Sequence, residues 1–162
     1  MEKQHALQQL EQLQKKLYAI HYACSAMNLD ADTVAPKNTS EGRGVALGVL
    51  AGEEQQLMIC PETRALLDEL DRQKDELDLL HRREVEELRR RCDQLTRIPA
   101  EEYIAYSELV NKAGDVWHKA KEKDDFAMFC PLLQELVEYN RKFAAYYDST
   151  RAPYDALLNE YE

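Results

Sequence analysis

The apolar residues of this chain recur every three or four positions, and this period constrains its fold more than any other feature. Residues 3–28 show the period most clearly. Their apolar members are Leu7, Leu10, Leu13, Leu17, Ile20, Cys24 and Met27. Such spacing places side chains on one face of an α-helix. Alternation with a period of two, which is typical of a half-buried strand, nowhere persists for a strand's length. The sequence therefore predicts an all-α fold.

Start and stop signals divide the rest of the chain into further helices. Residues 28–40 lose the helical period and contain Pro36, so we expect a long loop there. Further helices are expected from Ser40 (capped by Thr39 or Ser40), from Pro61, over 76–97, from Ala100 through Ala120, from Asp124 or Asp125 through Tyr147, and from Pro153. Pro131 either kinks or restarts the helix that contains it. These signals predict six to seven helices, the long ones antiparallel in a bundle-like array, within a single domain of residues 1–162.

Three of these helices carry more detailed predictions. Gly42, Gly44, Gly48 and Gly52 recur along the helix from Ser40, which predicts the close approach of another helix. The core side of 76–97 is expected to be Leu77, Leu80, Val85, Leu88, Cys92 and Leu95, with its arginines and glutamates on a solvated face. The core side of the helix from Ala100 is expected to be Tyr103, Tyr106, Val110, Ala113, Trp117 and Ala120.

Charge and hydropathy exclude several classes of protein. The formal net charge is -10 and the pI is near 4.9, which argues against a nucleic-acid partner. No stretch approaches the roughly 18 apolar residues of a membrane helix, and the start of the chain lacks the apolar segment of a signal peptide. We therefore expect no membrane partner and a cytoplasmic protein, whose four widely spaced cysteines are buried thiols.

Chemistry on a helical scaffold usually requires a metal held between helices. Two patterns, Asp78-x-x-His81 and Asp115-x-x-His118, each place a carboxylate and an imidazole on one helix face. The acid is Asp rather than the Glu of di-iron proteins, and no isolated inward-facing Glu stands out on a third helix. With 31 acidic residues, chance matches are expected. The zinc motif HExxH is absent from the sequence. We therefore assign neither catalytic nor metal-binding residues.

A cysteine nucleophile is equally unsupported. Cys24 lies one turn after His21, but on an apolar helix face, where an inert thiol is expected.

Three stretches of the sequence resemble one known family. Residues 29–36 (LDADTVAP) are similar to an early WDQETYMP loop, which residues 41–52 follow as a helix. Residues 98–131 are similar to VPAELV…AWxxARxxxDFxxFAP, and residues 153–162 to PYDALLDEYEPG. The family is the carboxypeptidase Taq type of thermostable zinc metallocarboxypeptidases. Its pattern is matched at Asp30, Thr33, Pro36, Trp117, Asp125, Phe126, Tyr154 and Asp155. Leu29 and Asp32 stand where the family has Trp and Glu, which puts a cleft role for this loop in doubt.

The resemblance implies a helical, homodimeric enzyme that uses zinc-activated water to remove C-terminal residues from peptides bound in a deep cleft. Its catalytic motifs do not occur in these 162 residues, so the resemblance transfers no catalytic residue and no cofactor. We expect a noncatalytic N-terminal helical part that forms one wall of the cleft. Its partner would be the remainder of a carboxypeptidase chain or a second copy of itself, and peptide substrate would bind only to the full-length enzyme.

Two other interpretations remain open. The chain could be a standalone helical module that self-associates or binds a partner helix. Alternatively, it could be a di-metal carboxylate protein that uses Asp78, His81, Asp115 and His118.

Overall fold

A computed structural model describes residues 3–36 and 38–158, and this part of the chain contains helices and no strand. In chain order the elements are α1 (Lys3–Thr33), α2 (Ser40–Ile59), α3 (Pro61–Arg72), the single-turn 3₁₀ helix η1 (Lys74–Glu76), α4 (Leu79–Arg97), α5 (Ala100–Glu122), α6 (Phe126–Tyr147) and α7 (Pro153–Leu158). The prediction of an all-α fold is confirmed. None of these helices is long and apolar enough to cross a membrane.

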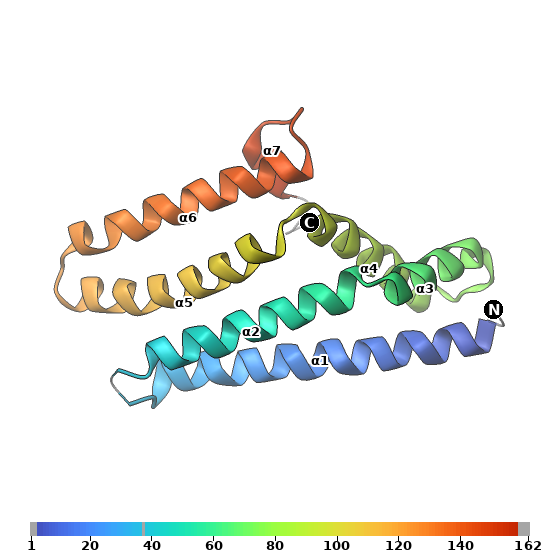
Figure 1. The fold of residues 1–162 in the computed structure, drawn as a ribbon, viewed down its shortest axis with the longest axis horizontal. Helices are drawn as coiled ribbons and strands as arrows, with labels where there is room; N and C mark the ends of the chain where they lie inside the picture. Colours follow the sequence, from blue (N-terminus) through green and yellow to red (C-terminus); the bar gives the residue numbers. More distant parts are fainter. Residues whose placement is uncertain (1–2, 37, 159–162) are drawn as a thin grey trace.

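The long helices lie side by side in an elongated array (Figure 1). α2 runs antiparallel to α1 and also packs along α5, which in turn pairs with the antiparallel α6. The α3–α4 end of the array lies beside the N-terminal half of α1, and α7 packs against α6. α2 is therefore the central helix, with α1 and α5 on its two sides.

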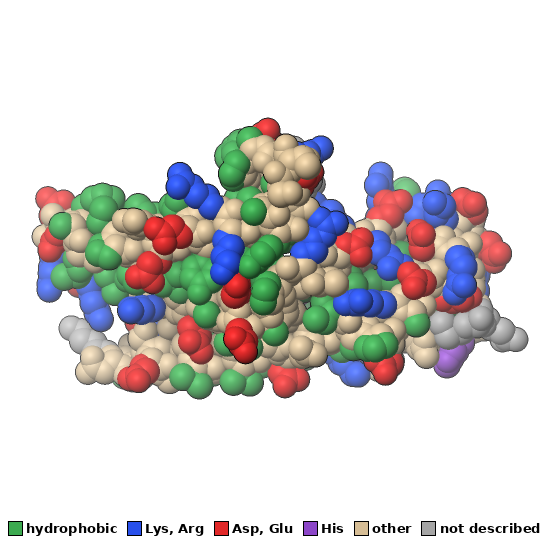
Figure 2. All heavy atoms as spheres, turned by 45° about the horizontal axis from the view of Figure 1, so that its top comes forward, with side chains coloured by type: hydrophobic (Ala, Val, Ile, Leu, Met, Phe, Trp, Pro, Cys, Tyr) green, Lys and Arg blue, Asp and Glu red, His purple; other side chains and the backbone are tan. Residues whose placement is uncertain are grey.

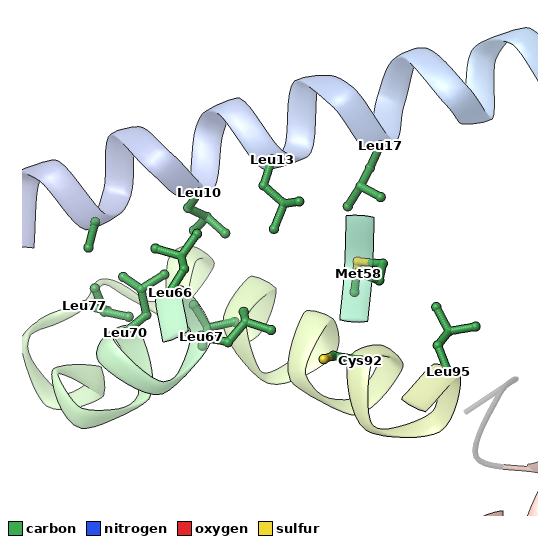
Figure 3. Close-up of a cluster of buried hydrophobic side chains, with 12 residues drawn as sticks. Leu10, Leu13, Leu17, Met58, Leu66, Leu67, Leu70, Leu77, Cys92 and Leu95 are labelled. Atoms are coloured by element: carbon green, nitrogen blue, oxygen red, sulfur yellow. The ribbon is translucent and has the colours of Figure 1, made fainter. Parts of the chain in front are cut away.

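The larger hydrophobic core lies where α1, α3, α4 and the end of α2 meet (Figure 3). Its buried members are Ala6, Leu10, Leu13, Leu17, Met58, Leu66, Leu67, Leu70, Leu77, Val85, Cys92 and Leu95. A smaller core joins α5 to α6 through Leu109, Ala113 and Leu132. Both cores arise from residues spaced three, four or seven apart, so the apolar period of the sequence accounts for them.

Caps and prolines set the ends of several helices. The carboxylate of Asp78 accepts a hydrogen bond from the backbone N–H of His81 at 2.9 Å and begins α4. Asp125 begins α6 in the same way, through the N–H of Met128 at 3.2 Å. Pro61 stands at the first position of α3, where its missing N–H breaks no helical hydrogen bond.

The predicted loop over residues 28–40 is too long, because α1 continues to Thr33. Positions 28–33 contain neither of the strong helix breakers, glycine and proline, and no proline occurs before Pro36. The hydroxyl of Thr33 donates to the carbonyl of Leu29 at 2.5 Å, within the last turn of the helix. The connection to α2 therefore begins at Val34; residue 37 lies outside the described part.

Other predicted helix boundaries also need correction. α4 begins at Leu79 rather than at 76, because Asp78 is its cap and Lys74–Glu76 forms η1. Thr39 precedes α2 without a side-chain cap, since its hydroxyl donates to the carbonyl of Pro36 at 2.9 Å. α6 runs through Pro131 without restarting there.

Several predicted core residues are exposed. Val110 and Trp117 are 46% and 42% exposed, because the α6-facing side of α5 follows Leu109 and Ala113 and these two side chains lie to one side of it. Leu80 is 67% exposed, since it lies in the first turn of α4, beyond the core.

The cysteines are less buried than predicted. Cys92 is buried, Cys24 and Cys60 are half-buried, and Cys130 is exposed on α6.

Candidate functional site

A cleft of about 530 Å³ runs over α2, with α1 on one side and α5 on the other. It is lined by Cys24, Asn28, Ala31 and Asp32 of α1, by Arg43, Leu47, Ala51 and Glu54 of α2, and by Tyr103, Tyr106, Ser107, Val110, Asn111, Gly114, Asp115 and His118 of α5. Most of these side chains are polar or charged. The cleft therefore brings together polar side chains from α1, α2 and α5.

A buried carboxylate closes one end of the cleft. Glu54 is 6% exposed, and its Oε1 lies 3.0 Å from Nε2 of His21 on α1. The guanidinium of Arg91 on α4 donates to the same oxygen. A buried charge requires such partners, because desolvation strongly disfavours an unpaired one. Glu54 thus connects α1, α2 and α4 through one atom.

Two further groups border this carboxylate. Burial raises the pKa of the Tyr103 phenol, the Glu54 carboxylate raises it further, and Arg91 acts in the opposite direction. Burial also raises the pKa of the Cys24 thiol, and Glu54 adds to that effect. A neutral phenol and a protonated thiol follow. His21 contacts Glu54, so the geometry does not support a thiolate nucleophile at Cys24.

The middle of the cleft is closed by a hydrogen-bonded clamp between α2 and α5. The side chain of Arg43, 10% exposed, donates to Asn111 Oδ1 at 2.9 Å and to Asp115 Oδ1 at 2.8 Å. The amide of Asn111 in turn donates to the carbonyl of Ser40 at 3.0 Å. Gly44 makes room for this arrangement, since a Cβ there would lie 3.0 Å from Asn111 Nδ2.

The opposite end of the cleft carries an exposed side-chain contact between α1 and α5. Nε2 of His118 lies 3.5 Å from Oδ1 of Asp32. The ring of Trp117 packs edge-on against the His118 imidazole at 4.8 Å, and Lys121 Nζ lies 4.9 Å from the Trp117 ring. This end is open to solvent, since the side chains of His118 and Asp32 are 53% and 66% exposed.

The structure does not bring the two predicted Asp-x-x-His pairs together. Asp78 and His81 lie at the start of α4, whereas Asp115 and His118 lie late in α5, and the two helices extend to opposite sides of the junction that joins them (Figure 1). Asp78 Oδ2 lies 2.8 Å from Nδ1 of His81 while its Oδ1 caps α4. Within residues 3–36 and 38–158, no three His, Cys, Asp or Glu side chains are grouped to hold a metal.

The residues that match the family pattern have mainly structural positions. Asp30 and Thr33 lie in the last turn of α1, and the Asp30 carbonyl accepts hydrogen bonds from the N–H groups of Val34 and Ala35 at 3.0 and 2.8 Å. The carbonyl of Pro36 accepts from Thr39. This segment therefore terminates α1 and leads into α2.

The remaining matches lie on α5, α6 and α7. Trp117 is partly exposed on α5, Asp125 caps α6, and Phe126 in its first turn is 65% exposed. Tyr154 and Asp155 are exposed on α7. Residues 159–162, the end of the third matching stretch, lie outside the described part of the chain.

Sequence reasoning missed Glu54 and Arg43, and it wrongly placed Arg91, which donates to the buried Glu54, on a solvated helix face. The expectation that no inward-facing Glu stands out was wrong for Glu54. It follows Leu47 by seven residues and precedes Met58 by four, so it lies on the apolar face of α2. A charged residue at such a position is the signal that could have identified it.

Comparison with known proteins identifies the family. Residues 9–162 match the Carboxypeptidase Taq (M32) metallopeptidase family. Because the match covers nearly the whole sequence, the chain belongs to this family.

Two curated relatives agree with this assignment. Carboxypeptidase 1 of Bacillus subtilis (strain 168) is 35% identical over 144 residues, which cover 88% of this chain and 29% of the relative. Thermostable carboxypeptidase 1 of Pyrococcus furiosus is 31% identical over 148 residues, which cover 91% of this chain and 30% of that protein. The chain thus spans less than a third of the length of either relative.

Solved structures show the same helices. The BsuCP crystal structure superposes with a TM-score of 0.91 and 32% identity, over 96% of this chain and 31% of that one. Trypanosoma cruzi metallocarboxypeptidase 1 gives a TM-score of 0.74 with 31% identity, over 98% of this chain and 32% of that one. The helical array is therefore a shared part of larger carboxypeptidase structures.

Proposed function

We propose that this chain acts as the noncatalytic N-terminal helical part of a zinc metallocarboxypeptidase and forms one wall of its peptide cleft. The observation that carries the proposal is the superposition of 96% of the chain on 31% of the BsuCP structure, with a TM-score of 0.91. Relatives named as carboxypeptidases give the reaction class: removal of C-terminal residues from peptides. In this role the chain positions other groups and performs no bond cleavage itself.

The paired side chains of the cleft support a scaffold role. Arg43 with Asp115, and Glu54 with His21 and Arg91, hold α2 to its neighbouring helices. Groups already paired in this way maintain the relative positions of helices. A wall made of them is preorganised, which is what a substrate cleft requires of its supporting elements.

The described residues do not fit the family's zinc ion. A catalytic zinc site needs three protein ligands that converge on one open position. Asp78 is committed to capping α4 and to His81, and Asp115 is held by Arg43. We therefore derive no step through zinc from the residues of this chain.

We propose the remainder of a carboxypeptidase chain, or a second copy of this one, as the partner. Peptide substrate would bind only to the complete enzyme. The net charge of -10 supports the absence of nucleic acid from the partners, and the compartment proposed is the cytoplasm.

A peptidase assay tests the proposal. The purified chain, supplied with zinc, is incubated with a test peptide beside Bacillus subtilis Carboxypeptidase 1 as positive control. We expect the control to release C-terminal amino acids and this chain to release none. Release by the chain that stops when a chelator is added would overturn the proposal.

Exposed apolar side chains favour one second candidate, a helical module that self-associates or binds a partner helix. Tyr18 and Tyr22 on α1 are 69% and 65% exposed and stack at 6.0 Å, and Val45 and Val49 on α2 are more than half exposed. Light scattering tests it: a dimer that dissociates when Tyr18 and Tyr22 are both changed to Ser supports it, and a monomer at all concentrations removes self-association.

A further inference from the structure

A second, smaller cleft, of about 330 Å³, lies between the C-terminal half of α4 and the connection from α6 to α7. Its lining residues are Arg90, Asp93, Gln94, Arg97, Tyr147, Asp148, Arg151 and Ala156. In Figure 2, Lys and Arg side chains gather between the protruding α7 and the half of the molecule that contains α4. Neither the family resemblance nor the cleft over α2 accounts for this concentration of arginines.

Two chain segments supply the three guanidinium groups. Arg90 and Arg97 are seven residues apart on α4, which places them two turns apart on the same face. Arg151 comes from the connection that faces them. The guanidinium of Arg97 donates to the backbone carbonyl of Tyr147, and this neutral acceptor holds the side chain in place. Hydrogen bonds from Thr150 lower the pKa of Asp148, and the charges of Arg151 and Arg97 lower it further, so Asp148 is the shared counterion of these two arginines.

Two carboxylates, Asp148 and Glu87, pair with these cations, and both pairs are partly exposed to solvent. Asp148 Oδ1 accepts hydrogen bonds from the N–H and hydroxyl of Thr150 at 2.9 and 2.6 Å, while Oδ2 lies 3.5 Å from Nε of Arg151. Arg90 pairs with Glu87, whose side chain is 65% exposed. Exposed ion pairs of this kind contribute only about 0–1 kcal/mol, so an incoming anion can replace them.

The cleft is less acidic than the chain as a whole. Three arginines and two aspartates line it, and Glu87 beside it pairs with Arg90, so its formal charge is +3 − 3 = 0 in a chain of net charge -10. Guanidinium groups present paired N–H donors that match the oxygens of phosphate, and several of them around one cavity bind it better than one. We propose that this cleft binds a phosphate group, carried either by the free ion or by the phosphate ester of a small molecule. The inference does not depend on the proposed function.

Titration calorimetry with inorganic phosphate at low ionic strength tests the proposal on the whole chain. We expect saturable binding of one phosphate per chain, weakened about tenfold or more by Arg97→Gln and by Arg151→Gln. Arg83→Gln is the matched control, because Arg83 lies on α4 outside the cleft, 75% exposed and paired with Glu86. Its affinity should stay within about twofold of the parent chain.

Arg97→Gln also removes the contact with the Tyr147 carbonyl, so circular dichroism checks that each variant is folded. If that variant unfolds, Arg151→Gln decides, since its ion pair in the structure is an exposed one with Asp148. Tighter binding of glycerol 3-phosphate than of inorganic phosphate supports the ester as ligand, and the reverse supports the free ion. Absence of saturable binding to both, or an equal loss in Arg83→Gln, overturns the proposal.

Discussion

Glu54 holds three helices together through one carboxylate oxygen. His21 lies 3.0 Å from this oxygen and Arg91 donates to it, while the Glu54 side chain itself is 8% exposed. Without Glu54, His21 and Arg91 would be left beside an empty buried position, although both can still turn toward water.

We expect Glu54→Ala to lower the free energy of unfolding by about 2 kcal/mol, because Arg91 loses its acceptor and His21 loses the carboxylate that it contacts. Urea unfolding followed by circular dichroism measures the change. Glu53→Ala is the control, since Glu53 is exposed on the same turn of α2, and its effect should stay within about 0.5 kcal/mol. Equal effects of the two variants would show that the Glu54 contacts do not stabilise the fold.

Asp78 makes the stability of the α4 end depend on pH. The backbone N–H of His81, followed by its side chain, holds the pKa of Asp78 below its ordinary value of 3.8. A carboxyl group whose pKa is lowered by folding stabilises the protein above its unfolded pKa. That contribution is lost as the pH falls through the lowered, folded value.

The melting temperature of Asp78→Ala should therefore lie below that of the parent chain at neutral pH, and the gap should shrink in strong acid. Thermal unfolding followed at both pH values measures it. Asp75→Ala, which removes an exposed carboxylate from η1, should show no comparable gap at neutral pH. A gap for Asp78→Ala that is independent of pH would contradict the assigned role of its charge.

At the scale of elements, α2 shows why glycine spacing was informative. A Cβ on Gly44, Gly48 or Gly52 would lie 3.1 Å or less from a side chain of α5, so the prediction of close helix packing is confirmed. A Cβ on Gly42 would meet no atom within 4 Å, and the same holds for Gly114 on α5. The spacing alone could not show that Gly44, Gly48 and Gly52 contact α5 whereas Gly42 does not.

We expect Gly44→Ala to destabilise the protein by about 1 kcal/mol, because Asn111 is held by Arg43 and Ser40 and cannot move aside freely. Gly114→Ala should instead stabilise it by about 0.5–1 kcal/mol, since alanine has the higher helix propensity. Denaturant unfolding of both variants gives the comparison. Stabilisation by Gly44→Ala would contradict the clamp between α2 and α5.

The α3–α4 end of the array contains both buried and exposed leucines. Leu67 is fully buried, whereas Leu80 is 67% exposed despite its place in the predicted apolar stripe. Leu67→Ala should lower the free energy of unfolding by about 3 kcal/mol through the cavity it creates. Leu80→Ala should change it by less than about 0.5 kcal/mol, and a large effect at Leu80 would indicate that a partner or further chain covers it.

For the molecule as a whole, the period of apolar residues was enough to predict the class of fold and the order of its helices. It could not predict which flank of a helix meets a neighbour, which is why Trp117 was assigned to the core. The Glu54 cluster could not be predicted either, because His21, Glu54 and Arg91 are up to 70 residues apart in sequence and only tertiary packing brings them together.

We propose above all that this part of the M32 family supports a cleft and holds no hydrolytic metal. The zinc content of the purified chain, measured by elemental analysis after dialysis against a zinc-containing buffer, tests it most directly. We predict well below about 0.1 zinc per chain, because no described residues converge as ligands. About one zinc per chain, lost when His81 and His118 are both changed to Ala, would contradict it.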